Sequence, residues 1–205
     1  MLEMSSMGAK VMQPNAVQAS MVNNITVHVR STFSGNSGTK IVSEDETDYK
    51  KVVTGIAYSK NNAKVSIVGV VDKPGVAADV FEPIGKNNIN IDMVIQNTSL
   101  DGKTANITFT IKQEDLNKTL NIIEKNKKKI SYNKLTHNDK LAKVSIIGAG
   151  MIASPGVTYK MFRSLADEKI NILAISTSEI KISVLIREDL TQKAVKTLHK
   201  AFGLN

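Results

Sequence analysis

The chain has 205 residues, 41% of them hydrophobic, which suffices for one sizeable domain or two small ones with a packed core. It contains no cysteine and only three histidines, so disulfides, thiol catalysis and thiolate metal sites are excluded and metal ligands are few. The formal net charge of +8 could mark a polyanion partner, but much of the excess lies in residues 124–134, where a solvated helix end is the better interpretation.

The first elements in chain order lie in residues 1–59. They do not have the basic start and apolar stretch of a secretory signal peptide. No apolar run in the chain approaches the roughly 18 to 20 residues of a membrane-spanning helix. We therefore expect a cytoplasmic protein. His28 and Arg30, in "ITVHVRS", are interpreted as polar members of an edge strand, and "KVVTGIAYS" at 51–59 has the pattern of a further strand.

Two stretches that follow are nearly alike: "AKVSIVGVVDKPGVAADVF" from Ala63 and "AKVSIIGAGMIASPGVTYKMF" from Ala142. Each opens with a β-branched run, at 64–70 and 143–149, that predicts a buried strand. Each then meets Pro-Gly, and Pro74 and Pro155 are predicted to be first helical residues because a missing N–H is harmless there. Ser154 is a good N-cap for the second helix.

The rest of each copy predicts helix, strand, strand and helix. The first helices are expected at 75–88 and 156–169, and Pro83 should bend the first of them. Their apolar stripes are Val76, Val80, Phe81 and Ile84 in one copy and Val157, Met161, Phe162 and Leu165 in the other. Strands are expected at 89–97 and 170–178, then at 104–112 and 179–187, and closing helices at 113–127 and 188–202.

Each copy is thus β-α-β-β-α and lacks the fourth strand of a ferredoxin-like unit. The first copy has one available at 129–136, whereas the second copy's missing strand is best supplied by residues 51–59. We therefore predict an α+β fold of two ferredoxin-like βαββαβ units, the first inserted into the second. The predicted boundaries are 61–137 for the first unit and 49–60 plus 138–205 for the second, after a separate segment at 1–48.

The segments "DKPGVAADVF", "NINIDMVIQN", "SPGVTYKMF" and "ISTSEIKISV" together resemble the tandem ACT domains of aspartate kinase. The resemblance extends over nearly everything from Lys51 onward. It implies an allosteric regulatory chain or fragment of aspartate kinase that binds an end product, lysine or threonine or both, for feedback inhibition, and that forms a homodimer through its ACT units. The alternative that remains open is an ACT-type amino-acid-binding dimerisation module that acts without a kinase partner.

Residues 1–48 resemble the end of the aspartate kinase catalytic domain, including its Gly-Ala-Lys turn, although Gln13-Pro14-Asn15 replaces the family's His-Pro-Arg. In the resembled kinases the lysine of this turn approaches the nucleotide, so Lys10 is a possible remnant of that site, expected to be solvated. The family's Lys-Phe-Gly-Gly-Thr segment and aspartate-binding loop have no counterpart. We therefore expect no catalysis by this chain alone, no bound cofactor, ATP and Mg only in a complete kinase, and a catalytic aspartate kinase chain as partner.

An amino-acid effector is a zwitterion that needs donors for its carboxylate and acceptors for its ammonium group. The unsatisfied first-turn amides of Gly75, Val76 and Ala77 are predicted donors, and Asp72 is the predicted ammonium partner. Gln96 and Asn97 can bind the remainder. Equally, Asp72 could cap the helix, Gly75 could serve close packing, and Gln96-Asn97 could form an ordinary turn.

With the resemblance included, the predicted effector residues fall into two sets. In the first unit they are Asp72, Lys73, Pro74, Gly75, Val76, Ala77, Asn90, Ile91, Asp92, Gln96 and Asn97. In the second unit they are Ser154, Gly156, Val157, Ser176, Thr177, Ser178 and Glu179. Since the second copy has Met151-Ile152-Ala153 and no carboxylate at the place of Asp72, the first unit is predicted to be the principal effector unit.

The sequence argues against two other functions. Kinase activity of the chain alone is opposed by the missing phosphate-binding segment. RNA binding by a ferredoxin-like sheet is opposed by the low aromatic content of 4%, because the recognition strands of such modules stack bases on aromatic side chains.

Overall fold

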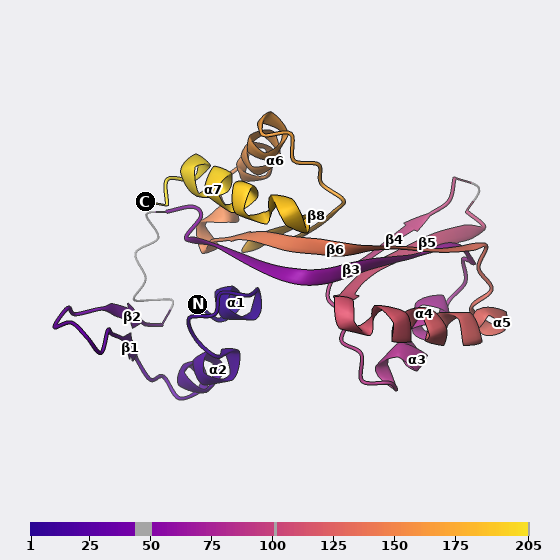
Figure 1. Cartoon of the computed structure of the whole chain (residues 1–205), viewed down its shortest axis with the longest axis horizontal. Coiled ribbons are helices and arrows are strands. Elements are labelled where there is room, and N and C mark those ends of the chain that lie inside the picture. Colours follow the sequence, from indigo (N-terminus) through magenta and orange to yellow (C-terminus); the bar gives the residue numbers. More distant parts are fainter. Residues whose placement is uncertain (44–50, 101, 205) are drawn as a thin grey trace. The chain divides into compact units, whose positions relative to one another are not determined.

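The computed structural model describes residues 1–43, 51–100 and 102–204 (Figure 1). They form two compact units. The first-repeat unit contains Lys60–Lys143 and Leu185–Asp189, and the second-repeat unit contains Met1–Ser59, Val144–Val184 and Leu190–Asn205. The boundaries predicted at 60/61 and 137/138 stay a prediction, and the one at 48/49 lies outside the described residues.

The sheet of the first-repeat unit is antiparallel and has β5 (Thr104–Lys112) between β3 (Gly55–Val71) and β4 (Val94–Thr98). Ile107 lies opposite Ile67 on β3 and opposite Gln96 on β4, so these three side chains share one face. Helices α3 (Val76–Gly85), α4 (Leu116–Lys125) and α5 (Lys127–Ile130) lie together on one side of these strands (Figure 1). A 3-10 turn at Gln113–Asp115 leads into α4, and β6 (Lys134–Ile147) follows α5.

The core of this unit joins the sheet to α3. The α3 stripe is confirmed, since Val76, Val80 and Ile84 are buried and Phe81 packs partly buried against the same core. Phe81 meets the fully buried Phe109 edge to face, with ring centroids 5.3 Å apart. Burying side chains of this size contributes roughly 1.5 to 3 kcal/mol each, so the helix is held mainly by its apolar stripe.

The second-repeat unit follows the same order of elements. It has a 3-10 turn at Ala149–Met151, α6 (Val157–Asp167), β7 (Ala174–Ser178), most of β8 (Lys181–Arg187) and α7 (Thr191–Ala201), which packs against α6 (Figure 1). A 3-10 turn at Glu188–Leu190 precedes α7. Its N-terminal part contains α1 (Leu2–Ser6), α2 (Pro14–Val22), β1 (Val27–Val29) and β2 (Thr39–Ile41). The α+β class with two ferredoxin-like units is confirmed.

Residues ahead of the first repeat lie against the second repeat. The amide and the hydroxyl of Thr54 both donate to the carbonyl of Ile147, at 2.8 and 3.1 Å. Gly148 also lies against residues 52–53, because a Cβ placed on it would stand 2.8 Å from the Cα of Val53. Such contacts are what insertion of the first repeat into the second requires.

Several predicted element boundaries were wrong. Residues 51–59 and 64–70 do not form two strands, because β3 runs unbroken through residues 55–71. The strand expected at 129–136 begins only at Lys134 and continues into the second repeat as β6, while Lys129 belongs to α5. The strands expected from 89 and 170 begin at Val94 and Ala174, and residues 89–93 and 170–173 belong to no helix or strand.

None of the helices in the described ranges is long and apolar enough to cross a membrane.

Candidate functional site

The loop between β3 and α3 turns on Lys73, Pro74, Gly75 and Val76. The amide of Val76 donates to the carbonyl of Lys73 at 3.2 Å, and Gly75 has φ 92° and ψ −9°. These values match the third residue of a type II turn, which favours Pro-Gly at its centre and requires a positive φ that glycine adopts without strain. The sequence therefore forms a turn here before the helix begins.

This turn corrects the predicted helix starts. Neither Pro74 nor Pro155 is a first helical residue, and Ser154 is not the N-cap: the helices begin at Val76 and Val157, capped by Gly75 and Gly156. Gly156 has φ 90° and ψ −7°, nearly the values of Gly75, so the two repeats share one elbow geometry. The physical reason is that Pro-Gly prefers the centre of a type II turn to the first turn of a helix.

Two of the three predicted amide donors remain available at the first elbow. The amide of Val76 is used by the turn, whereas in the described parts of the chain the amides of Gly75 and Ala77 have no hydrogen-bond acceptor. The space above Gly75 is open, because a Cβ placed there would meet nothing within 4 Å. Unsatisfied amides at the start of a ten-residue helix favour an anion.

Asp72 is held in place at the end of β3 by two hydrogen bonds. Its amide donates to the carbonyl of Lys103 at 3.0 Å, and its carboxylate accepts from the hydroxyl of Thr98 at 3.3 Å. The alternative to a binding role, in which the side chain of Asp72 caps the helix, is wrong, because no side chain caps the start of α3. Thr98 was missed by sequence reasoning, although its spacing of two residues from Gln96 on one strand was an available signal.

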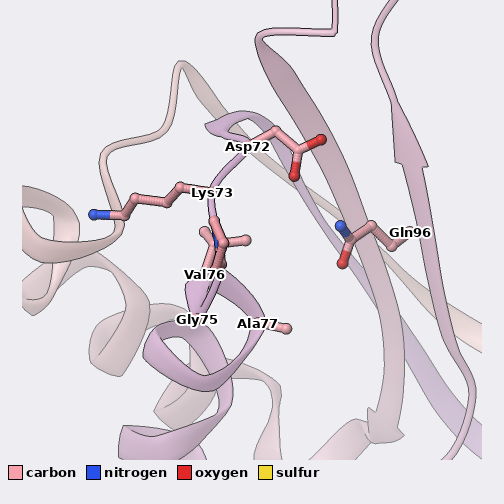
Figure 2. A pocket seen from close by; sticks show the side chains of 7 residues that line it. Asp72, Lys73, Gly75, Val76, Ala77 and Gln96 are labelled. Carbon is pink, nitrogen blue, oxygen red and sulfur yellow. The ribbon is translucent and has the colours of Figure 1, made fainter.

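Seven predicted residues line one pocket of about 470 Å³, and they come from the elbow and from β4. They are Asp72, Lys73, Pro74, Gly75, Val76, Ala77 and Gln96. Figure 2 shows the side chains of Asp72 and Gln96 directed toward one another across the pocket, while the Lys73 side chain extends away from Gln96. One face of the pocket therefore presents a carboxylate and an amide opposite the helix start.

The other predicted residues of the first unit do not line this pocket. Asn90 and Asn97 are exposed, and Ile91 packs against the hydrophobic core. Asp92 forms an ion pair with Lys143, whose side chain is only 7% exposed. Sequence reasoning missed Lys143 because a lysine beside an apolar run reads as a solvated residue at a strand end.

The predicted residues of the second unit lie at its own elbow and edge. Ser154, Gly156 and Val157 lead into α6, and Ser176, Thr177 and Ser178 end β7. Glu179 follows in an exposed turn. Lys10 is exposed in the turn after α1, as expected of a solvated side chain. Their role in binding stays a prediction.

Charged side chains secure α3 from its outer side. Lys129 on α5 lies 3.0 Å from the carboxylates of both Asp79 and Glu82, and Lys86 lies 2.7 Å from Glu82. Hydrogen bonds from Lys86 and Lys129 lower the pKa of Glu82 from 4.5 to about 2. Hydrogen bonds with Glu82 and, second, with Asp79 raise the pKa of Lys129. These pairs are solvent-exposed, so they orient α5 on α3 more than they stabilise the fold.

Residues 1–43, 51–100 and 102–204 contain no group of three or more His, Asp or Glu side chains arranged to hold a metal ion. The polar side chains that line the pocket are those of Asp72, Lys73 and Gln96, which offer a carboxylate, an ammonium group and an amide.

Comparison with known proteins identifies the class to which this fold and pocket belong. The family model of the ACT domain matches residues 65–126 and 144–202, one match in each repeat. The chain therefore belongs to the ACT domain family.

Within that class, the similar proteins are aspartokinases. An aspartokinase of Mycolicibacterium smegmatis is 43% identical over 208 residues, which cover the whole of this chain and 49% of the relative. A chain in a crystal structure of aspartokinase alpha and beta subunits is 45% identical, with a TM-score of 0.69 over 74% of this chain and 99% of that one. The regulatory subunit of aspartate kinase from Thermus thermophilus is 34% identical, with a TM-score of 0.68 and the same coverages.

The resemblance to the regulatory region of aspartate kinase is thereby confirmed. The chain spans about half the length of the curated relatives it matches and nearly all of these solved regulatory chains.

Proposed function

We propose that this chain is a regulatory part of an aspartate kinase and that its first elbow binds a free end-product amino acid, which inhibits the kinase. The observation that carries the proposal is that Asp72, the elbow and Gln96 line the same pocket. The similarity to aspartokinases and to a solved regulatory subunit of aspartate kinase supports aspartate kinase as the enzyme that is regulated. In that reaction a complete kinase phosphorylates L-aspartate with ATP and Mg.

The groups that line the pocket match the two ends of a zwitterion. The free amides of Gly75 and Ala77 are suited to the carboxylate, and the carboxylate of Asp72 is suited to the ammonium group. Gln96 can donate to or accept from a polar side chain of the effector. The partial positive charge at the start of α3 and the negative charge of Asp72 thus orient the ligand in one direction.

We propose threonine rather than lysine as the ligand of this pocket. Its lining contains one carboxylate, which the α-ammonium group occupies, so the second ammonium of lysine finds no acidic partner there. A threonine hydroxyl can hydrogen-bond to Gln96, while its methyl group can rest on Val76 or Ala77. Lysine, if it acts on the same enzyme, would bind elsewhere in the assembly.

Inhibition requires that the effector bind one arrangement of the assembled enzyme better than another. A catalytic aspartate kinase chain is the proposed partner, and a homodimer through the ACT units is the proposed regulatory assembly. The second-unit residues at Ser154 and Ser176 are then proposed to shape the pairing surface. The cytoplasmic location expected from the sequence stays a prediction.

Calorimetric titration of the purified chain with L-threonine and, separately, L-lysine tests the binding step. We expect saturable threonine binding with a Kd of about 1 mM or tighter, which corresponds to roughly 4 kcal/mol or more. N-acetyl-L-threonine is the matched control, because it lacks the ammonium group that Asp72 is proposed to hold. If neither amino acid binds, or if the acetylated form binds equally well, the proposed recognition is wrong.

Regulation is tested by a coupled assay of aspartate phosphorylation with the chain and a catalytic aspartate kinase chain combined. Inhibition by the effector that depends on this chain supports the proposal. Binding without any effect on a kinase would favour the alternative of an independent amino-acid-binding module.

A further inference from the structure

Strand β3 contains one extra residue immediately before the pocket. Ile67 lies opposite Ile107 and Val70 lies opposite Ala105, so β3 advances three residues while β5 advances two. Val68 and Gly69 together therefore face the single residue Asn106, which is the arrangement of a β-bulge.

The bulge determines which face of the sheet each later residue occupies. Side chains alternate between faces along a strand, and a shift of one residue exchanges the two faces. Val70 is fully buried on the face of Ile67, although an unbroken alternation would turn it to the opposite face. Because of the bulge, Val71 is 45% exposed and Asp72, two residues beyond Val70, returns to the face of Val70.

The same face carries the partner groups of Asp72. Gln96 lies opposite Ile107 and Thr98 lies opposite Ala105, so both share the face of Ile67 and Val70. The Thr98 hydroxyl reaches the carboxylate of Asp72 at 3.3 Å, which is possible only when the two side chains are on one face. A regular β3 of the same length would present Val71 to Thr98 and turn Asp72 away.

Three contacts hold the bulge. Gly69 has φ +70°, a left-handed conformation that other residues adopt at a cost, and its amide donates to the side-chain oxygen of Asn106 at 3.0 Å. The amide of Asn133 donates to the carbonyl of Val68 at 3.0 Å. The side chain of Asn133 also closes over Gly69, because a Cβ placed on Gly69 would stand 2.8 Å from the Cγ of Asn133.

We infer that the bulge at Val68–Gly69, held by Asn106 and Asn133, is the positioning element of the amino-acid pocket: it sets Asp72 on the face that carries Gln96 and Thr98. Gly69, Asn106 and Asn133 are positioning residues, since none of them lines the pocket. The part of this inference that concerns ligand affinity rests on the proposed function. The part that concerns the face of Asp72 does not.

The face of Asp72 can be determined by thiol cross-linking, because the chain has no cysteine of its own. Strand β5 lies between residue 72 and Thr98, so the test uses a bifunctional thiol reagent that spans two strand spacings, roughly 10 Å, and not direct oxidation. In the D72C/T98C variant the two thiols lie on one face and are expected to be linked by the reagent. In the V71C/T98C variant they lie on opposite faces and are expected to stay unlinked. The two variants form a matched pair that differs only in whether residue 71 or residue 72 carries the first cysteine.

Three changes then act on the bulge. Gly69→Ala places a side chain where φ is positive and where the side chain of Asn133 would have to move, so the bulge should be lost. The two pairs should then exchange behaviour: V71C/T98C should link and D72C/T98C should not. Deletion of Gly69 removes the extra residue itself, so the alternation returns Asp72 to its original face and D72C/T98C should link as before. Asn106→Ala removes only the acceptor for the Gly69 amide. It should slow the linking of D72C/T98C without abolishing the fold.

Ligand affinity provides the second measurement, in variants that keep Asp72 and Thr98. Gly69→Ala is expected to weaken threonine binding roughly 10- to 100-fold, the value of one charge-assisted hydrogen bond, whereas deletion of Gly69 is expected to weaken it much less. Gly203→Ala is the matched control, since Gly203 has φ +60° in open space in the second-repeat unit. It should leave both the links and the affinity unchanged.

The outcomes separate the two proposals. If D72C/T98C links equally fast with and without Gly69→Ala, or if deletion of Gly69 is as harmful as its substitution, the bulge does not set the face of Asp72 and the inference is wrong. If the links behave as expected but no amino acid binds the parent chain, the positioning stands and the proposed function fails. Should Gly69→Ala not fold, Asn106→Ala and the deletion still decide the question.

Discussion

The ion pair between Lys143 and Asp92 leads to a prediction about stability, because its two members are buried unequally. The Lys143 side chain is 7% exposed, whereas that of Asp92 is 42% exposed. Removing the carboxylate leaves an ammonium group almost out of water with its charge unbalanced. Removing the lysine leaves a carboxylate that water can already reach.

The two substitutions should therefore have very different costs. Breaking a buried pair by deleting one partner costs about 3 to 5 kcal/mol, and the exposure of Asp92 lowers this to about 2 to 3 kcal/mol for Asp92→Ala. Lys143→Met keeps the apolar stem of the side chain and removes the buried charge, so it should change the free energy of unfolding by about 1 kcal/mol or less. The double variant should recover most of the loss, because no unpaired buried charge remains.

Urea unfolding followed by circular dichroism measures these free energies, with an unchanged slope as the sign that the cooperative unit is the same. Asp139→Ala is the control, since Asp139 is exposed on β6, and it should alter stability by about 0.5 kcal/mol or less. Equal losses in Asp92→Ala and Lys143→Met would refute the argument from unequal burial. So would a double variant as unstable as Asp92→Ala.

Three further predictions concern the pocket, the packing and the response to acid. Asp72→Asn keeps the shape of the side chain and removes its charge, so threonine should bind roughly 10- to 100-fold more weakly by calorimetry, while Asp139→Asn has no effect. Gly148→Ala should lower the free energy of unfolding in urea by about 3 kcal/mol, because the new methyl group meets the backbone of Val53. Gly85→Ala should raise it by about 0.5 to 1 kcal/mol, because Gly85 belongs to α3 and a Cβ placed on it meets nothing within 4 Å. The pKa of Glu82 is lowered from 4.5 to about 2, so the contribution of its ionised carboxylate to the stability of the fold is complete above pH 4.5 and is lost as the pH falls toward 2. The difference in melting temperature between the parent chain and Glu82→Gln should therefore shrink over that pH range.

The periodic features of the fold were predictable from the sequence. The repeated β-branched runs, the Pro-Gly elbows and the apolar stripe of α3 all follow from local preferences and from spacing, and the structure contains each of them. Six of the pocket residues are contiguous, from Asp72 to Ala77, so finding one end of the pocket in the sequence was enough to find most of it.

Other features depend on residues that are distant in sequence. The partners Thr98 and Asp72, or Lys143 and Asp92, meet only because strands and loops are aligned in a particular register, which no local pattern specifies. The helix starts were misplaced because Pro-Gly suits both a first helical turn and a type II turn, and the chain around it decides between them.

The sequence by itself determined that this protein is a pair of α+β repeats with a polar elbow in the first, because hydrophobic period and turn chemistry are properties of neighbouring residues. Only the tertiary structure decided on which face of the sheet Asp72 stands. That outcome depends on one additional residue in β3, absorbed as a bulge against Asn106, and the alternation of side chains carries its effect to the pocket.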